Sequence, residues 1–248
     1  MSLTAREILI YLSLKNNGKW EDIYENISQR KEISNEEALE TLKSFQEENK
    51  DIKVITILDE EYPEILKQGY RPPFVLFCKG DTTLLKENII AFLGSREKTN
   101  PYIAQATINK LKEENSVLIT TTSRGENAET LSTAIENGIK TILVLSSGIS
   151  KYFPLETKEI SKKVNLIISE YPPQVSVDKK FFVRSKQILV SLCKSLCVGH
   201  INPNSGILLG IHFALEGGKD IFVAPVDLSE SSKYKNNEII EEGAYILR

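Results

Sequence analysis

One stretch of the sequence combines the residue types that phosphate binding requires. The run from Asn88 to Arg96 reads N-I-I-A-F-L-G-S-R, in which five apolar residues precede Gly94 and Ser95. A buried strand, a tight turn and a helix N-terminus leave the first backbone N–H groups unpaired, and such groups attract anions. The Arg96 guanidinium can donate two parallel hydrogen bonds to a phosphate. The stretch therefore predicts a phosphate site, although an ordinary turn with a solvated arginine fits the same residues.

Other patterns that could support chemistry are sparse. His200 follows an apolar run and could face a crevice, whereas His212 lies inside a helical pattern, and no third ligand accompanies them. A zinc site is therefore not predicted. The sequence contains neither the G-x-S-x-G pattern of a nucleophile elbow nor the G-x-x-x-x-G-K-[ST] pattern of a P-loop. We predict no metal, no cofactor and no catalytic role.

The elements that would position these residues alternate along the chain. Short apolar runs typical of buried strands are followed by longer helical patterns from residue 89 onward. Strands are predicted at 52–58, 74–78, 89–93, 116–121, 141–145, 165–169, 195–199 and 220–224, and helices at roughly 101–114, 126–137, 155–163, 180–192 and 205–216. Strands that alternate with helices at this spacing predict βαβ units and an α/β fold, with a mostly parallel sheet and helices on both faces.

The first 50 residues show a different pattern. Apolar residues recur there at helical spacing, and Ser34 with Glu37 forms the sequence signature of a capping box. The sequence therefore predicts a small helical domain at 1–50, packed separately from an α/β domain at 51–248. This helical part could be a packing appendage or a binding module.

Composition restricts the class of protein. The chain has 248 residues, of which 41% are hydrophobic and 26% charged, as in an ordinary globular protein. Its net charge of −3 gives no overall attraction to nucleic acid or membrane, so any such surface must be a local patch. Three cysteines without a C-x-x-C pair indicate a reducing compartment. Without an evident signal peptide or membrane-spanning run, we predict a cytoplasmic protein.

A series of short motifs extends from about residue 60 to the C-terminus. They are, in order, Glu61-Tyr62-Pro63, Arg71-Pro72-Pro73, Lys79-Gly80-Asp81, Leu93-Gly94-Ser95-Arg96, Gly138-Ile139-Lys140-Thr141-Ile142, Tyr152-Phe153-Pro154, Ile168-Ser169-Glu170-Tyr171-Pro172, Phe182-Val183-Arg184, Ser205-Gly206, Val223-Ala224-Pro225 and the run from Asn237 to Ala244. Their order and spacing resemble the DNA-processing protein A (DprA/Smf) family, whose members load the RecA recombinase onto single-stranded DNA during transformation. The resemblance implies an extended Rossmann-like fold, a non-enzymatic role, single-stranded DNA and RecA as partners, and a homodimer.

The resemblance also implies a positively charged DNA pocket. Carried over by motif, the DNA- and phosphate-binding residues are Gly94, Ser95, Arg96, Arg124, Lys179, Lys180, Arg184, Lys186, Ser205 and Gly206. Because the carboxyl ends of parallel strands open on one side of a sheet, loops after several strands can meet there. We therefore expect Arg96, Lys180, Arg184 and Lys186 to converge on one crevice beside Gly94 and Ser95. For Arg184 and Lys186 the alternative is a solvated helix start.

Several positions depart from the family's motifs. Where the family usually has S-G-L-A-R-G-I-D and then a histidine, this chain has T-T-T-S-R-G-E-N at residues 120–127 and Leu131 at the histidine position. Arg124 and Gly125 are retained, but the R-N-R segment becomes Arg184-Ser185-Lys186. The changes remove glycines and polar groups that serve phosphate recognition, so we expect weaker DNA binding than in a full-motif relative.

Two alternatives remain beside the DNA-binding interpretation. One is a nucleotide-binding protein or nucleotide phosphoribohydrolase with a related Rossmann-like fold, although the chain lacks the P-G-G-x-G-T segment of those enzymes. The other is a diverged relative that keeps the fold and has lost tight DNA binding.

Overall fold

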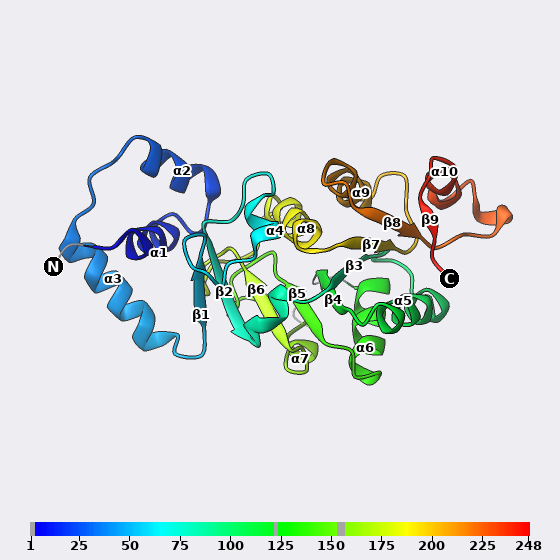
Figure 1. Cartoon of the computed structure of the whole chain (residues 1–248), viewed down its shortest axis with the longest axis horizontal. Coiled ribbons are helices and arrows are strands. Elements are labelled where there is room, and N and C mark those ends of the chain that lie inside the picture. The colour runs from blue at the N-terminus through cyan, green and yellow to red at the C-terminus, as the bar shows by residue number, and fades with distance from the viewer. Residues whose placement is uncertain (1–2, 122–123, 153–156) are drawn as a thin grey trace.

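A single sheet runs through the computed structural model, which describes residues 3–121, 124–152 and 157–248 (Figure 1). Its strand order is β1-β2-β6-β5-β4-β3-β7-β8-β9. The strands are β1 (Lys53–Thr56), β2 (Val75–Gly80), β3 (Ile89–Leu93), β4 (Val117–Thr121), β5 (Thr141–Val144), β6 (Leu166–Ser169), β7 (Ser195–Val198), β8 (Asp220–Val223) and β9 (Tyr245–Ile246). All eight strands predicted from apolar runs are present, and β9 is an addition.

The predicted, mostly parallel sheet is confirmed. Every pairing from β6 across to β9 is parallel, and only β1 with β2 and β2 with β6 are antiparallel among the described strands. At the centre, Ala91 of β3 lies opposite Ile119 of β4 and Leu196 of β7. All residues of β3 are buried, because helices cover both faces of a parallel sheet.

Helices cover the two faces of the sheet, as predicted. The helices that follow the N-terminal region are α4 (Glu64–Lys67), α5 (Pro101–Glu113), α6 (Glu126–Glu136), α7 (Thr157–Ser161), α8 (Phe181–Leu192), α9 (Ile207–Glu216) and α10 (Asn236–Glu241), with 3₁₀ turns at Thr82–Lys86 and Leu228–Glu230. Ala91 packs in one apolar cluster with Ile188 of α8, whereas Phe92 packs in the other with Ile108 of α5. Figure 1 shows α8, α9 and α10 on one side of the sheet and α5, α6 and α7 on the other. The predicted helix at 155–163 is described only from Thr157.

The helical N-terminal region comprises α1 (Ala5–Lys15), α2 (Trp20–Ser28) and α3 (Asn35–Glu48). These helices bury a small cluster of their own, yet they do not pack separately from the sheet. Phe45 lies edge-on to Phe77 of β2 at 5.8 Å, and Trp20 stacks on Phe74 at 5.3 Å. The expectation of separate packing is therefore corrected, because apolar residues of α1 and α3 complete the core over β1 and β2. A domain boundary at residue 50 stays a prediction.

The start of α3 forms only half of the predicted capping box. Ser34 accepts the backbone N–H of Glu37 at 3.4 Å, as an N-cap residue should. The Glu37 carboxylate does not reach back; it accepts hydrogen bonds from Tyr11 Oη at 2.7 Å and Lys15 Nζ at 2.9 Å in α1. The acidic residue therefore joins two helices instead of closing one.

Candidate nucleic-acid interface

A crevice of about 480 Å³ opens beyond the carboxyl ends of β3 and β7. The chain leaves this pair of strands in opposite directions, because β4 lies on the far side of β3 and β8 on the far side of β7. Ligands bind at such switch points in open α/β sheets. The lining combines the turn after β3, the first turns of α8 and the loop before α9, and includes Gly94, Ser95, Arg96, Glu97, Thr121, Asn127, Phe182, Ser185, Lys186, Asn202, Asn204, Ser205 and Gly206.

Six of the ten predicted site residues lie on this crevice, although they are spread over more than a hundred positions of the sequence. They are Gly94, Ser95, Arg96, Lys186, Ser205 and Gly206. The parallel topology accounts for their convergence, since each segment leaves the same edge of the sheet. Whether these residues bind a ligand stays a prediction.

Two cations flank Phe182 at the rim. The exposed Arg96 guanidinium lies 5.2 Å from the centre of the Phe182 ring, and Lys186 Nζ donates to the Phe182 carbonyl oxygen at 3.2 Å. Burial, together with the nearby charge of Arg96, lowers the pKa of Lys186 to about 8. The rim therefore offers two positively charged groups at neutral pH, one of them only partly hydrated.

Arg184 does not take the predicted position, and it is absent from the described lining of the crevice. Its guanidinium binds Glu170 through two hydrogen bonds, Nε to Oε1 at 2.9 Å and Nη2 to Oε2 at 2.6 Å, and Nη1 donates to Gln187 at 2.8 Å. The two charged side chains are only 16% and 4% exposed. Burial alone would lower the pKa of Arg184, but the Glu170 carboxylate more than offsets this and the pKa is raised. Arg184 is thus half of a buried ion pair.

The remaining predicted cations are exposed and do not belong to the described lining of the crevice. Lys179 and Lys180 precede α8, where the Lys180 N–H donates to Asp178 Oδ1 at 2.9 Å. Arg124 precedes the N-cap of α6, and the neighbouring Thr122 and Ser123 of the same motif lie outside the described residues. A DNA contact by any of these three cations stays a prediction.

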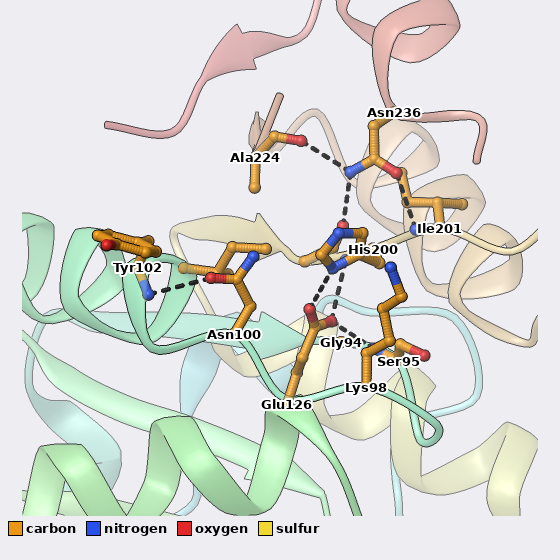
Figure 2. Close-up of polar contacts among 12 residues, drawn as sticks. Gly94, Ser95, Lys98, Asn100, Tyr102, Glu126, His200, Ile201, Ala224 and Asn236 are labelled. Carbon is orange, nitrogen blue, oxygen red and sulfur yellow. Dashed lines mark hydrogen bonds and ion pairs between the residues drawn. The ribbon is translucent and has the colours of Figure 1, made fainter. Parts of the chain in front are cut away.

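The backbone N–H groups of Gly94 and Ser95, in the turn for which the sequence predicts a phosphate site, are occupied by side chains of the protein. The Ser95 N–H donates to Glu126 Oε2 at 2.7 Å, and the His200 N–H donates to the same oxygen at 2.9 Å. The other oxygen, Oε1, contacts His200 Nδ1, as Figure 2 shows. The Gly94 N–H donates to Asn127 Oδ1 at 3.1 Å. Side chains from the first turn of α6 therefore fill the anion site that the turn would otherwise offer.

Sequence reasoning missed this role of Glu126. It treated the residue as a departure from a motif and His200 as an isolated polar residue at a strand end. The available signal was an acidic residue at the first helical position, followed by an asparagine, in a segment with a buried face. Only the strand order brings that position next to β7.

A larger hollow of about 820 Å³ lies elsewhere, between α3 and the loop that precedes α8. Its lining contains Glu37, Glu40, Glu48 and Asp178 against a single lysine, Lys19. An acidic lining repels phosphates, so charge favours the smaller crevice as the nucleic-acid site.

Among the described residues, no group of three or more His, Cys, Asp or Glu side chains is placed to hold a metal ion. No helix in the same part of the chain is both long and apolar enough to cross a membrane.

Known proteins resemble this chain in sequence and in structure. The model of the DNA recombination-mediator protein A family matches residues 53–248. The DNA processing protein DprA of Streptococcus pneumoniae is 30% identical over 197 residues, which cover 77% of this chain and 70% of the relative. DprA of Bacillus subtilis is 29% identical over 201 residues, which cover 78% and 67%.

Solved structures agree with these matches. The X-ray structure of DprA from Streptococcus pneumoniae superposes with a TM-score of 0.78 at 26% identity and covers 99% of this chain and 95% of its own. A DprA structure from Helicobacter pylori, described for its mode of single-stranded DNA binding, gives a TM-score of 0.66 at 25% identity. That match covers 78% of this chain and 89% of the other.

Proposed function

Because the chain belongs to the DNA recombination-mediator protein A family, we propose that it binds single-stranded DNA as a mediator of DNA processing and recombination. The observation that carries the proposal is the crevice at the β3/β7 switch point, where Arg96 and Lys186 flank an aromatic ring. The structure of the Helicobacter pylori relative is described for its mode of single-stranded DNA binding, which supports the same ligand here.

Phosphate contacts would supply most of the affinity. The Arg96 guanidinium and the Lys186 ammonium stand at the rim, and the Ser205 hydroxyl lies on the same lining. Cations in a groove hold a single strand through its backbone, even on a protein whose net charge is −3. Because contacts to phosphate carry no sequence information, we expect little preference among bases.

We propose further that the bound strand is passed to the RecA recombinase and that the chain works as a homodimer. Both proposals rest on the family and not on a contact within this chain. The role needs positioning of a strand and no bond to be made or broken, so we assign the crevice no catalytic residue.

The test compares single-stranded with double-stranded oligonucleotides in a fluorescence anisotropy titration at two salt concentrations. We expect tighter binding of the single strand, and a log–log salt slope of about −0.7 for each phosphate contacted. Oligonucleotides of different base composition should bind alike. Absence of single-strand binding at low salt would favour the diverged scaffold that has lost its DNA affinity.

A further inference from the structure

An anion hole lies behind the turn after β3, which forms one wall of the crevice, and a side chain of the protein occupies the hole. Backbone N–H groups from two different strand ends, Ser95 after β3 and His200 after β7, point at one oxygen of Glu126 (Figure 2). Convergent backbone donors at a switch point are the groups that hold phosphates and other anions of ligands in such sheets. Here the Glu126 carboxylate, in a residue that is 1% exposed, takes the place of a ligand anion.

Two glycines leave the room that this carboxylate needs in the hole. A Cβ at Gly94 would lie 2.8 Å from Glu126 Oε2, and one at Gly199 would lie 2.3 Å from the same atom. Both distances are shorter than real Cβ contacts, so only glycine allows the carboxylate to approach the two strand ends. A backbone bond in the opposite direction, from the Glu126 N–H to the Ser95 carbonyl at 2.9 Å, fixes the start of α6 in place.

The surrounding groups hold the carboxylate firmly. His200 is buried, contacts Glu126 through Nδ1 and packs its ring edge-on against Tyr234 at 4.8 Å. Lys98 Nζ lies over the Tyr234 ring, 4.7 Å from its centre, and pairs with Glu230. A buried carboxylate that accepts three contacts in a fixed cradle is costly to displace, because its hydrogen bonds are charge-assisted.

We propose that Glu126 determines the ligand specificity of the crevice: it admits phosphodiester groups at the rim and excludes phosphate monoesters from the inner hole. This inference rests on the proposed function, since the rim is where the DNA backbone would bind. A monoester, such as a nucleotide or a 5′-phosphorylated DNA end, ends in a phosphate that could enter such a hole, but the Glu126 side chain already occupies the space between the two donors. A phosphodiester carries a single negative charge and can be held by Arg96 and Lys186 outside the hole.

The test uses two variants of one residue. Glu126→Ala empties the hole and frees the Ser95 and His200 donors, whereas Glu126→Gln removes the charge and keeps the hole filled. Inorganic phosphate is titrated into each full-length protein while the backbone amide signals of Ser95 and His200 are followed by NMR. In parallel, anisotropy compares one oligothymidine with and without a 5′-phosphate.

We expect the wild type and Glu126→Gln to show no shift of these amides with phosphate, and the 5′-phosphate to change their DNA affinity by less than about twofold. In Glu126→Ala, phosphate should shift both amides, and the 5′-phosphate should raise affinity about tenfold, as one added charge-assisted hydrogen bond would. The phosphate titration does not depend on DNA binding, so it still reports on the hole if the proposed function fails.

Three results would overturn the inference. Phosphate-induced shifts of Ser95 and His200 in the wild type would show that Glu126 does not close the hole. Phosphate binding by Glu126→Gln as strong as that by Glu126→Ala would show that filling is not what excludes the anion. A Glu126→Ala protein that keeps its circular dichroism spectrum but ignores phosphate would show that the donors do not form an anion site. If that variant fails to fold, the titrations of the wild type and of Glu126→Gln still decide, because a phosphate-induced shift of Ser95 and His200 in either protein contradicts exclusion by a filled hole.

Discussion

Arg96 packs against α8 and Arg184 lies within it, and the molecule uses the two residues in opposite ways. Arg96 is exposed at the crevice and stacks over Phe182, with no carboxylate bound to it among the ion pairs of the described residues. The Arg184 side chain is only 16% exposed, and Glu170 neutralises its charge. A basic residue near a site is therefore available to DNA only if the fold leaves its charge uncompensated.

Lys186 extends this comparison, because it lies two residues from Arg184 and its pKa shifts in the opposite direction. Burial lowers the pKa of Lys186, and its nearest charge is another cation, Arg96. Burial acts on Arg184 in the same sense, but a carboxylate reverses the result. Arg96 and Lys186 thus bring two positive charges together at the crevice. The positive charge of Arg184, in contrast, is neutralised by Glu170.

The largest effect should come from breaking the buried pair. Arg184→Ala leaves the Glu170 carboxylate, which is 4% exposed, without its partner. We expect a loss of about 3–5 kcal/mol in the free energy of unfolding, since an uncompensated buried charge is strongly destabilising. Urea denaturation followed by circular dichroism measures it.

A double variant provides the control for that prediction. Arg184→Met with Glu170→Gln removes both charges, so it should be less destabilised than Arg184→Ala. If Arg184→Ala keeps full stability and loses DNA affinity instead, Arg184 belongs to the binding surface and the comparison with Arg96 fails.

The second effect concerns binding and not stability. Arg96→Ala should weaken single-stranded DNA binding about tenfold, the value of one charge-assisted contact, and flatten the salt slope by about 0.7. Unfolding stability should change by no more than about 0.5 kcal/mol, because the side chain is exposed. Arg96→Lys, which keeps the charge, is the matched control and should retain the slope. An unchanged slope in Arg96→Ala would place the DNA elsewhere.

The third effect depends on pH. Lys186, with a pKa of about 8, is charged at pH 7 and largely neutral at pH 9. Rising pH therefore removes a cation from the crevice, and single-strand affinity should fall about three- to tenfold over this interval. A bound phosphate favours the charged form, so the midpoint in the complex should lie above 8. Lys186→Arg stays charged throughout and should abolish the decline; a decline of equal size in that variant would assign it to another group.

The sequence predicted the sheet well because a short, unbroken apolar run such as 89–93 by itself indicates a strand buried on both faces. It missed β9 and α10, which have two and six residues and are too short for a periodic pattern. It also treated Arg96 and Arg184 alike, because the pairing of Arg184 with Glu170 joins positions fourteen residues apart through tertiary packing. The same limit hid Glu126, whose partner His200 is 74 residues away.

The smallest effect should come from Lys179 and Lys180, the two exposed cations that precede α8. Because neither belongs to the described lining of the crevice, we expect them to attract DNA only at a distance. Such attraction is screened beyond about 8 Å at physiological ionic strength. The double variant Lys179→Ala with Lys180→Ala should therefore lose less than about twofold in affinity at that salt, within the spread of an ordinary surface substitution. At a salt concentration of about 0.01 M the loss should grow, because the screening length there is about 30 Å. Anisotropy titrations at both salts, with Arg96→Ala measured alongside, check the difference. A tenfold loss that persists at physiological salt would extend the binding surface from the crevice to the start of α8.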